Sequence, residues 1–199
     1  MTSEKTTTLR RSREDVVKAA ARLFAERGYH GTSMRDLGRE LGLLGSSLYS
    51  HVSSKEDLLV EVVEMGAALF EASAQAALQS ADEPERQLQA LISGHIDVVV
   101  DHLDEVRTFL NEANALHDRY RVVSRRDEYE SVFREVLADG VERENFRSDL
   151  DPKMAGIFIL SLLNATERWY RPDGPLDRFG LVEEMWSFVA EGIGLDQTT

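Results

Sequence analysis

The side chains best suited to bind a phosphate or a base edge lie in one short stretch, residues 32–55, which reads TSMRDLGRELGLLGSSLYSHVSSK. Ser46 and Ser47 are small residues near the start of a predicted short helix, where unpaired backbone N–H groups attract phosphate. Tyr49 and His51 follow on the same segment, pointing away from its apolar side. Such a helix can approach a groove closely, so the stretch predicts contact with nucleic acid.

Two short helices joined by a tight turn would position these side chains. Thr32 or Ser33 can cap the first helix. Its apolar face recurs at helical spacing: Met34, Leu37 and Leu41. Gly42 ends this helix, since glycine tolerates the left-handed cap conformation. The second helix, about residues 45–51, packs back on the first through Leu48 and Val52. The pattern predicts a helix-turn-helix.

A long helix follows directly. Ser53 and Glu56 predict a capping box for it, and apolar positions recur at helical spacing from Lys55 to about Gln79. We expect this helix to begin beside DNA and to end inside the rest of the chain. It is the natural mechanical connection between the two parts.

The segment from Val16 to Leu59, with AAARLFAERGYHGTSMRDL and LYSHVSSKEDLL, resembles the DNA-binding domain of the TetR family of bacterial repressors. The resemblance implies that Tyr49 and Lys55 contact DNA phosphates. The turn before Ser46 is less polar and less basic than is usual in that family, so the operator sequence does not follow. The predicted DNA-binding residues are Thr32, Ser33, Arg35, Gly45, Ser46, Ser47, Tyr49, His51 and Lys55.

Charge is unevenly distributed over the 199 residues, whose net charge is −13. Residues 1–60 hold ten Lys and Arg against eight Asp and Glu, and residues 61–199 hold 13 against 28. The basic start, with Lys5, Arg10, Arg11 and Arg13, suits phosphate contact, whereas the acidic remainder would be repelled by DNA. An acidic surface that only aids solubility explains much of the excess equally well.

Several classes of protein are disfavoured by what the sequence lacks. There are no cysteines, and five histidines are scattered along the chain. We find no G-x-S-x-G, no phosphate-binding glycine loop and no H-E-x-x-H, so an enzyme is not expected. His95 and His102 share a helix face without a carboxylate at ligand spacing, so we predict no metal and no cofactor. No apolar run approaches the roughly 20 residues of a membrane span, and a cytoplasmic location is expected.

The remaining chain predicts an all-α fold of about nine helices, because no useful stretch alternates in polarity. We expect a DNA-binding domain over residues 1–54 and an effector-binding and dimerisation domain over residues 55–199. Residues 154–169 are apolar nearly all round, which indicates more than one packing partner. The resemblance implies a homodimer through the last two helices on a palindromic operator; a monomer that buries this helix internally is the alternative.

The middle helices would enclose the effector, with polar side chains that could equally be paired within the core. Residues 162–176 (LLNATERWYRPDGPL) and 140–152 resemble the TetR subgroup that controls fatty-acid, steroid or aromatic-acid catabolism and responds to acyl-CoA thioesters. An efflux regulator that responds to lipophilic drug-like ligands, or a helical interaction module that does not bind DNA, are the alternatives. The predicted ligand-binding residues are Phe70, Phe109, Asn114, His117, Phe133, Phe158, Asn164, Arg168 and Trp169.

Overall fold

The computed structural model describes residues 12–43, 45–50, 52–116 and 120–194. These residues form nine α-helices and one short 3-10 helix, with no β-strand among them, as the all-α prediction requires. The elements are α1 (Arg13–Arg27), α2 (Met34–Leu41), α3 (Gly45–Leu48), α4 (Lys55–Ser80), α5 (Pro84–Asp101), α6 (Leu103–Glu112), η1 (Ala113–Ala115), α7 (Tyr120–Glu142), α8 (Pro152–Trp169) and α9 (Arg178–Ile193).

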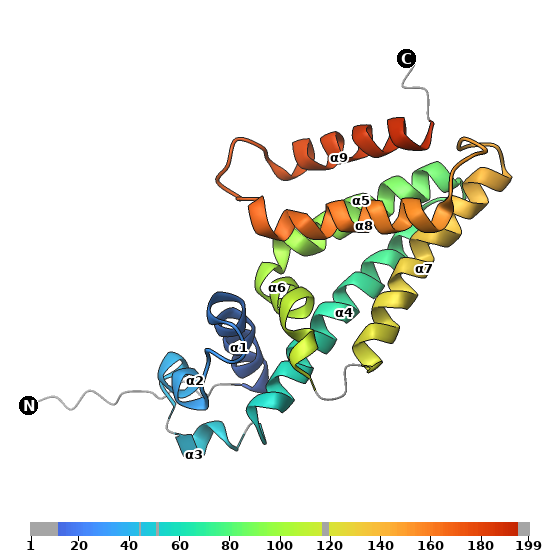
Figure 1. Ribbon diagram of the computed structural model, residues 1–199. Coiled ribbons are helices and arrows are strands. Elements are labelled where there is room, and N and C mark those ends of the chain that lie inside the picture. Colours follow the sequence, from blue (N-terminus) through green and yellow to red (C-terminus); the bar gives the residue numbers. More distant parts are fainter. Residues whose placement is uncertain (1–11, 44, 51, 117–119, 195–199) are drawn as a thin grey trace, which may run out of the picture.

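Helices α1 to α3 form a small unit at one end of the molecule, which we call the head (Figure 1). Capping boxes start both longer helices: Ser12 pairs with Asp15 on α1, and Ser33 pairs with Asp36 on α2. Gly42 ends α2 in the left-handed conformation, with φ of 66°. Leu37 and Leu48 are fully buried, so the predicted packing of the two short helices on each other is confirmed.

The long helix α4 leaves the head and enters the larger unit formed by α5 to α9, which we call the body (Figure 1). Its N-cap is Ser54, whose hydroxyl accepts the backbone N–H of Asp57 at 3.0 Å. The predicted capping box of Ser53 and Glu56 is therefore misplaced by one residue. Ser54 and Asp57, the next serine and acidic residue at the same spacing, occupy these positions. Gly66 lets α6 approach α4 closely: a Cβ there would lie 2.8 Å from Cβ of Phe109.

Proline occupies the first position of two body helices. Asp151 caps α8 by accepting the N–H groups of Lys153 and Met154, and Pro152 follows at its first position. Pro84 likewise begins α5, although Glu83 forms no side-chain cap there. Helix α9 begins at Arg178, and Asp177 caps it by accepting the backbone N–H of Gly180.

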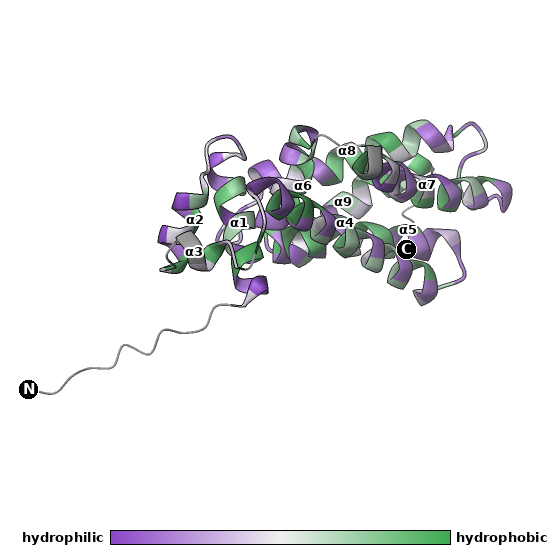
Figure 2. Ribbon diagram, turned by 90° about the horizontal axis from the view of Figure 1, so that it is seen from below, coloured by the Kyte–Doolittle hydropathy of each residue, from purple (hydrophilic) through white to green (hydrophobic). Residues whose placement is uncertain are grey.

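Two apolar clusters form the core. One joins α1, α2 and the first half of α4 to α6, and the other joins the second half of α4 to α5, α7, α8 and α9. Hydrophobic and hydrophilic residues alternate along the helices, as amphipathic packing requires (Figure 2). None of the described helices is long and apolar enough to cross a membrane.

Candidate DNA-binding head and central cavity

The outer surface of the head presents part of the predicted DNA-binding set. Tyr49 is 57% exposed and Arg35 is exposed, while Ser47 is half-buried. Ser33 is exposed, and its hydroxyl is used in capping α2. These positions are compatible with the predicted contacts with DNA, which stay predictions. Helix α3 begins at Gly45 and Ser46, and His51 lies outside the described residues, as does the part of the basic arm before Ser12.

Two residues of that set make contacts inside the head, Thr32 and Lys55. Thr32 is only 2% exposed, and its hydroxyl lies 3.1 Å from the carbonyl of Leu23 and 3.0 Å from that of Gly28. Its side chain ties the end of α1 to the start of α2, so the prediction that it contacts DNA is wrong for this structure. Lys55 Nζ donates to the carbonyls of Tyr29 (2.8 Å) and Thr32 (2.9 Å).

Lys55 thus fastens the connecting helix to the head. Its ammonium also lies 4.1 Å from the centroid of the Tyr29 ring, a cation–π contact. Two of its three N–H donors are used in these contacts, which leaves one for a phosphate. The predicted phosphate contact stays possible in geometry, but the lysine has a structural role that its motif did not reveal.

A cavity of about 260 Å³ lies in the body against α4 to α8; we call it the central cavity. Rings and aliphatic side chains form most of its wall: Phe70, Phe109, Leu110, Tyr129, Ile157 and Leu160. Polar side chains of the wall are His95, Arg125, Arg126, Glu130, Ser161 and Asn164. An apolar wall with a few polar groups is the usual composition of a small-molecule site.

The polar pair His95 and Tyr129 sits deep in this wall. Nδ1 of His95 lies 3.1 Å from the Tyr129 hydroxyl, and the Phe70 ring stacks beside both. His95 is 1% exposed, and burial lowers the pKa of its imidazole to about 3, so the ring is neutral at pH 7. Burial raises the pKa of the Tyr129 hydroxyl, which keeps that group protonated.

Two arginines of α7 face the same cavity but are paired differently. Arg125 forms a two-pronged ion pair with Glu71 of α4, at 2.5 and 2.6 Å. Arg126 donates through Nη2 to the backbone carbonyls of Phe109 (2.6 Å) and Leu110 (3.2 Å), and its guanidinium lies over the Phe109 ring. Both carbonyls lie in the last turn of α6, so Arg126 fastens α7 to the end of that helix. Burial lowers the pKa of Arg126.

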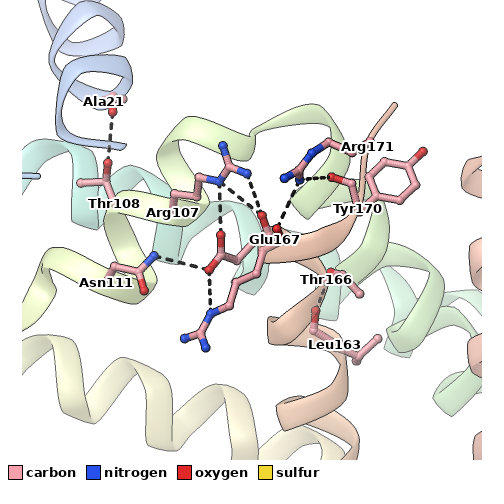
Figure 3. A network of polar contacts seen from close by, with 10 residues as sticks. Ala21, Arg107, Thr108, Asn111, Leu163, Thr166, Glu167, Tyr170 and Arg171 are labelled. Carbon is pink, nitrogen blue, oxygen red and sulfur yellow. Dashed lines mark hydrogen bonds and ion pairs between the residues drawn. The ribbon is translucent and has the colours of Figure 1, made fainter. Parts of the chain in front are cut away.

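Helix α6 connects the cavity to both the head and α8. Thr108 is buried and donates to the carbonyl of Ala21 in α1 at 3.2 Å, while its neighbour Phe109 forms cavity wall. Arg107 pairs with the buried Glu167 of α8 at 3.2 Å and donates to its carbonyl at 2.8 Å. Figure 3 shows this network, with Asn111 and Arg168 also on the Glu167 carboxylate. Three consecutive residues of α6 thus contact α8, the head and the cavity.

The predicted ligand residues fall into separate groups. Phe70, Phe109 and Asn164 line the central cavity, and their contact with a ligand stays a prediction. Phe133 is fully buried and packs behind Tyr129, with ring centroids 5.5 Å apart. Phe158 is 60% exposed on the outer face of α8, so the four predicted phenylalanines do not meet in the wall of this cavity.

The remaining members of that set lie away from the cavity wall. Asn114 is exposed, Trp169 is 50% exposed, and Arg168 is exposed beside Glu167. His117 lies outside the described residues. Arg171, just after α8, donates to the carbonyls of Arg168 and Tyr170.

Sequence reasoning missed Arg126 and Tyr129 as wall residues, and it considered His95 only as a metal ligand. The available signal was the presence of polar side chains on otherwise apolar helix faces: His95 on α5, and Arg126 and Tyr129 on α7. Among the described residues, no group of three or more His, Asp or Glu side chains is placed to hold a metal ion.

Comparison with known proteins agrees with this architecture. Residues 16–62 match "Bacterial regulatory proteins, tetR family", and residues 81–193 match "Tetracyclin repressor-like, C-terminal domain". The chain is 30% identical to the HTH-type transcriptional repressor KstR2 of Mycobacterium tuberculosis, over 91% of this chain and 92% of that protein.

Solved structures give the same result. The structure of the ketosteroid transcriptional regulator KstR2 superposes with a TM-score of 0.86, covering 91% of this chain and 94% of that one at 30% identity. AibR in complex with isovaleryl coenzyme A and operator DNA has a TM-score of 0.80 at 26% identity, covering 88% of this chain and 96% of that one. The chain belongs to the TetR family of bacterial transcriptional regulators.

Proposed function

We propose that the protein is a homodimeric repressor that leaves a palindromic operator when an acyl-CoA thioester places its acyl group in the central cavity. The head, residues 12–54 with the basic arm before it, binds DNA, and the rest of the chain binds the effector and the second subunit. Relatives support both halves of the proposal: KstR2 is a repressor, and AibR was solved with isovaleryl coenzyme A and operator DNA.

The position of α6 carries the proposal. Phe109 and Leu110 form cavity wall, and Thr108 between Arg107 and Phe109 is hydrogen-bonded to α1 of the head. A ligand that displaces the cavity wall therefore moves a helix to which the head is attached. Such coupling requires that the ligand bind the DNA-incompetent arrangement more tightly than the DNA-bound one.

The size and lining of the cavity favour a small acyl group. Drug-sized ligands occupy pockets of about 300–1,000 Å³, and this cavity is near the lower limit at about 260 Å³. Its apolar wall suits a short or branched acyl chain. Arg168 and Trp169 are exposed at the end of α8 and remain candidates for the nucleotide part of the thioester.

The outer faces of α8 and α9 support dimerisation. Large apolar side chains are exposed there, which is unusual for a surface that stays in water: Met154, Phe158, Leu162, Phe179 and Phe188. Two such helices from each subunit would bury these side chains in a four-helix bundle. The two heads would then face one side of the dimer and read two half-sites.

Fluorescence anisotropy of a labelled duplex taken from the DNA upstream of the protein's own gene tests the proposal. We expect competitor-resistant binding that saturated acyl-CoAs of one chain-length class release, and we expect Tyr49→Phe to weaken DNA binding without changing thioester binding. Absence of sequence-selective binding on any genomic fragment would contradict the repressor. Release by lipophilic drug-like compounds and by no thioester would instead favour the alternative function, regulation of an efflux system. The ligand of such a regulator would contact the same apolar wall.

A further inference from the structure

Two side chains in the wall of the central cavity, the buried His95 and the half-buried Arg126, each keep a buried nitrogen atom without a hydrogen-bond partner among the described residues. These atoms are Nε2 of His95 and Nε of Arg126. More than about 90% of buried polar groups in folded proteins have a partner. Two exceptions in the wall of one cavity, one of them on a side chain that is only 1% exposed, indicate that the site is completed by a polar group from a ligand.

The His95–Tyr129 pair always has one hydrogen-bond donor to spare. If Tyr129 donates to Nδ1, the proton of the neutral imidazole is on Nε2 and has no acceptor among the described residues. If Nδ1 donates instead, the Tyr129 hydroxyl proton is left over. In either tautomer the pair offers a donor, and burial holds both groups in their neutral forms.

Arg126 offers a second donor and a positive charge. Its two described hydrogen bonds go to neutral backbone carbonyls, and it forms no ion pair with another described residue. Its neighbour Arg125 differs, because Glu71 neutralises it at 2.5 Å. Arg126 is half-buried, and withdrawing a cation from water in part is unfavourable unless an anion or several acceptors surround it. An acceptor oxygen from a ligand would supply what the protein does not.

Resting on the proposed function, we propose that the cavity selects thioesters whose acyl chain carries a second oxygen function besides the thioester carbonyl, an oxo group or a carboxylate, that accepts hydrogen bonds from Arg126 and from the His95–Tyr129 pair. A purely hydrocarbon acyl group would fill the cavity and leave both donors buried without an acceptor. Sites built around a hydrogen bond reject analogues that lack the polar group. The apolar part of the wall, with Phe70 and Leu160, holds the rest of the chain.

Three coenzyme A thioesters with the same six-carbon chain test this inference: hexanoyl-CoA, 5-oxohexanoyl-CoA and adipoyl-CoA. Isothermal titration calorimetry with the full-length protein measures each dissociation constant. We expect at least one oxygenated thioester to bind about tenfold or more tightly than hexanoyl-CoA. The oxo and dicarboxylic arms distinguish a neutral oxygen from an anionic one.

Two variants locate the preference. His95→Phe removes the imidazole nitrogens but keeps a ring against Phe70, and Arg126→Met removes the charge. We expect each to reduce the preference to about threefold or less while hexanoyl-CoA binding changes little. Because Arg126 also fastens the end of α6, circular dichroism first checks that Arg126→Met has the helix content of the wild type. If this variant does not fold, His95→Phe alone tests the inference. A preference that persists in His95→Phe and in any folded Arg126→Met would overturn the inference, as would equal or tighter binding of hexanoyl-CoA to the wild type.

The methyl esters of the same three acyl groups, without coenzyme A, separate this inference from the proposed function: methyl hexanoate, methyl 5-oxohexanoate and monomethyl adipate. Equal binding of all three thioesters would leave the proposed function intact and remove the inference. Binding of the two oxygenated esters alone, lost in His95→Phe, would keep the inference and remove the thioester. Binding of none of the six compounds would count against both.

Discussion

The head and the body differ in how completely their buried polar groups are paired. In the head, Ser12 and Ser33 cap their helices, Thr32 is bonded inside, and Lys55 is held by two carbonyls. Among the described residues, the buried side-chain atoms without a partner belong to His95, Arg126 and Asn145, all in the body. The head is therefore complete without a ligand, whereas the cavity wall of the body is not.

The largest effect is expected from the core of the head. Leu37→Ala deletes a fully buried side chain between α1 and α2 and should lower the free energy of unfolding by about 3 kcal/mol. Urea denaturation measures this loss. The matched control is Val60→Ala on the exposed side of α4, which should change it by under about 0.5 kcal/mol. A loss below about 1 kcal/mol for Leu37→Ala would show that the head is loosely packed.

A pH titration tests the body, through the unpaired nitrogen of its buried His95. The pKa of His95 falls from 6.5 to about 3 on folding, so between these values the unfolded chain binds one proton more than the folded one. Above pH 6.5 His95 does not reduce the free energy of unfolding. As the pH falls from 6.5 towards 3, the histidine lowers this free energy by about 1.4 kcal/mol per pH unit.

The variant His95→Phe isolates this contribution from the carboxylates. Between pH 6.5 and 4.5 the wild type should lose about 2 kcal/mol more of its unfolding free energy than the variant. Urea titrations at a series of pH values give the difference. Parallel pH profiles would mean that His95 is hydrated or paired in solution, and the contrast between head and body would weaken.

Loss of the ion pair between Arg107 of α6 and Glu167 of α8 should have an intermediate effect on stability. Arg107→Met leaves the buried Glu167 with Arg168 and Asn111 as its other partners, and should cost about 1–2 kcal/mol of stability. Arg143→Met, which breaks an exposed pair with Asp139, is the control and should stay within about 0.5 kcal/mol. Thermal denaturation compares them. Equal effects would show that the network in Figure 3 is no stronger than a surface ion pair.

The smallest effect is expected from a single cap of the head. Ser33→Ala removes the acceptor for the Asp36 N–H and should lower stability by about 1 kcal/mol. Ser53→Ala is the control, because Ser54 and not Ser53 caps α4. Urea denaturation of both variants distinguishes them. A larger loss for Ser53→Ala would restore the capping box expected from the sequence.

The same contrast explains which features could be predicted from the sequence. The head depends on local signals, such as Ser33 before an apolar helix face and Gly42 after it, and these lie within one continuous stretch. The register of the α4 cap was missed because Ser53 and Ser54 offer the same chemistry to acidic residues three positions later. Local patterns define an element well and its first residue less well.

The cavity wall consists of side chains from separate helices, and no local sequence pattern predicts that these side chains lie close together. His95 and Tyr129 are 34 positions apart, and each alone is compatible with a packed core. Phe158 was misplaced because α8 is apolar on several faces, and Ile157, Leu160 and Asn164 occupy the one that faces the cavity. Periodicity shows that a residue is on an apolar face, but it does not identify the partner of that face.

The most direct test compares wild type and His95→Phe on one operator fragment, with and without 5-oxohexanoyl-CoA, by fluorescence anisotropy. If the head is complete by itself and the cavity is completed by a ligand oxygen, both proteins should bind DNA with the same affinity in the absence of thioester. The thioester should then release the wild type at a concentration at least about tenfold lower than the variant. Altered DNA affinity of the variant alone, or equal release of both proteins, would contradict this division between head and body.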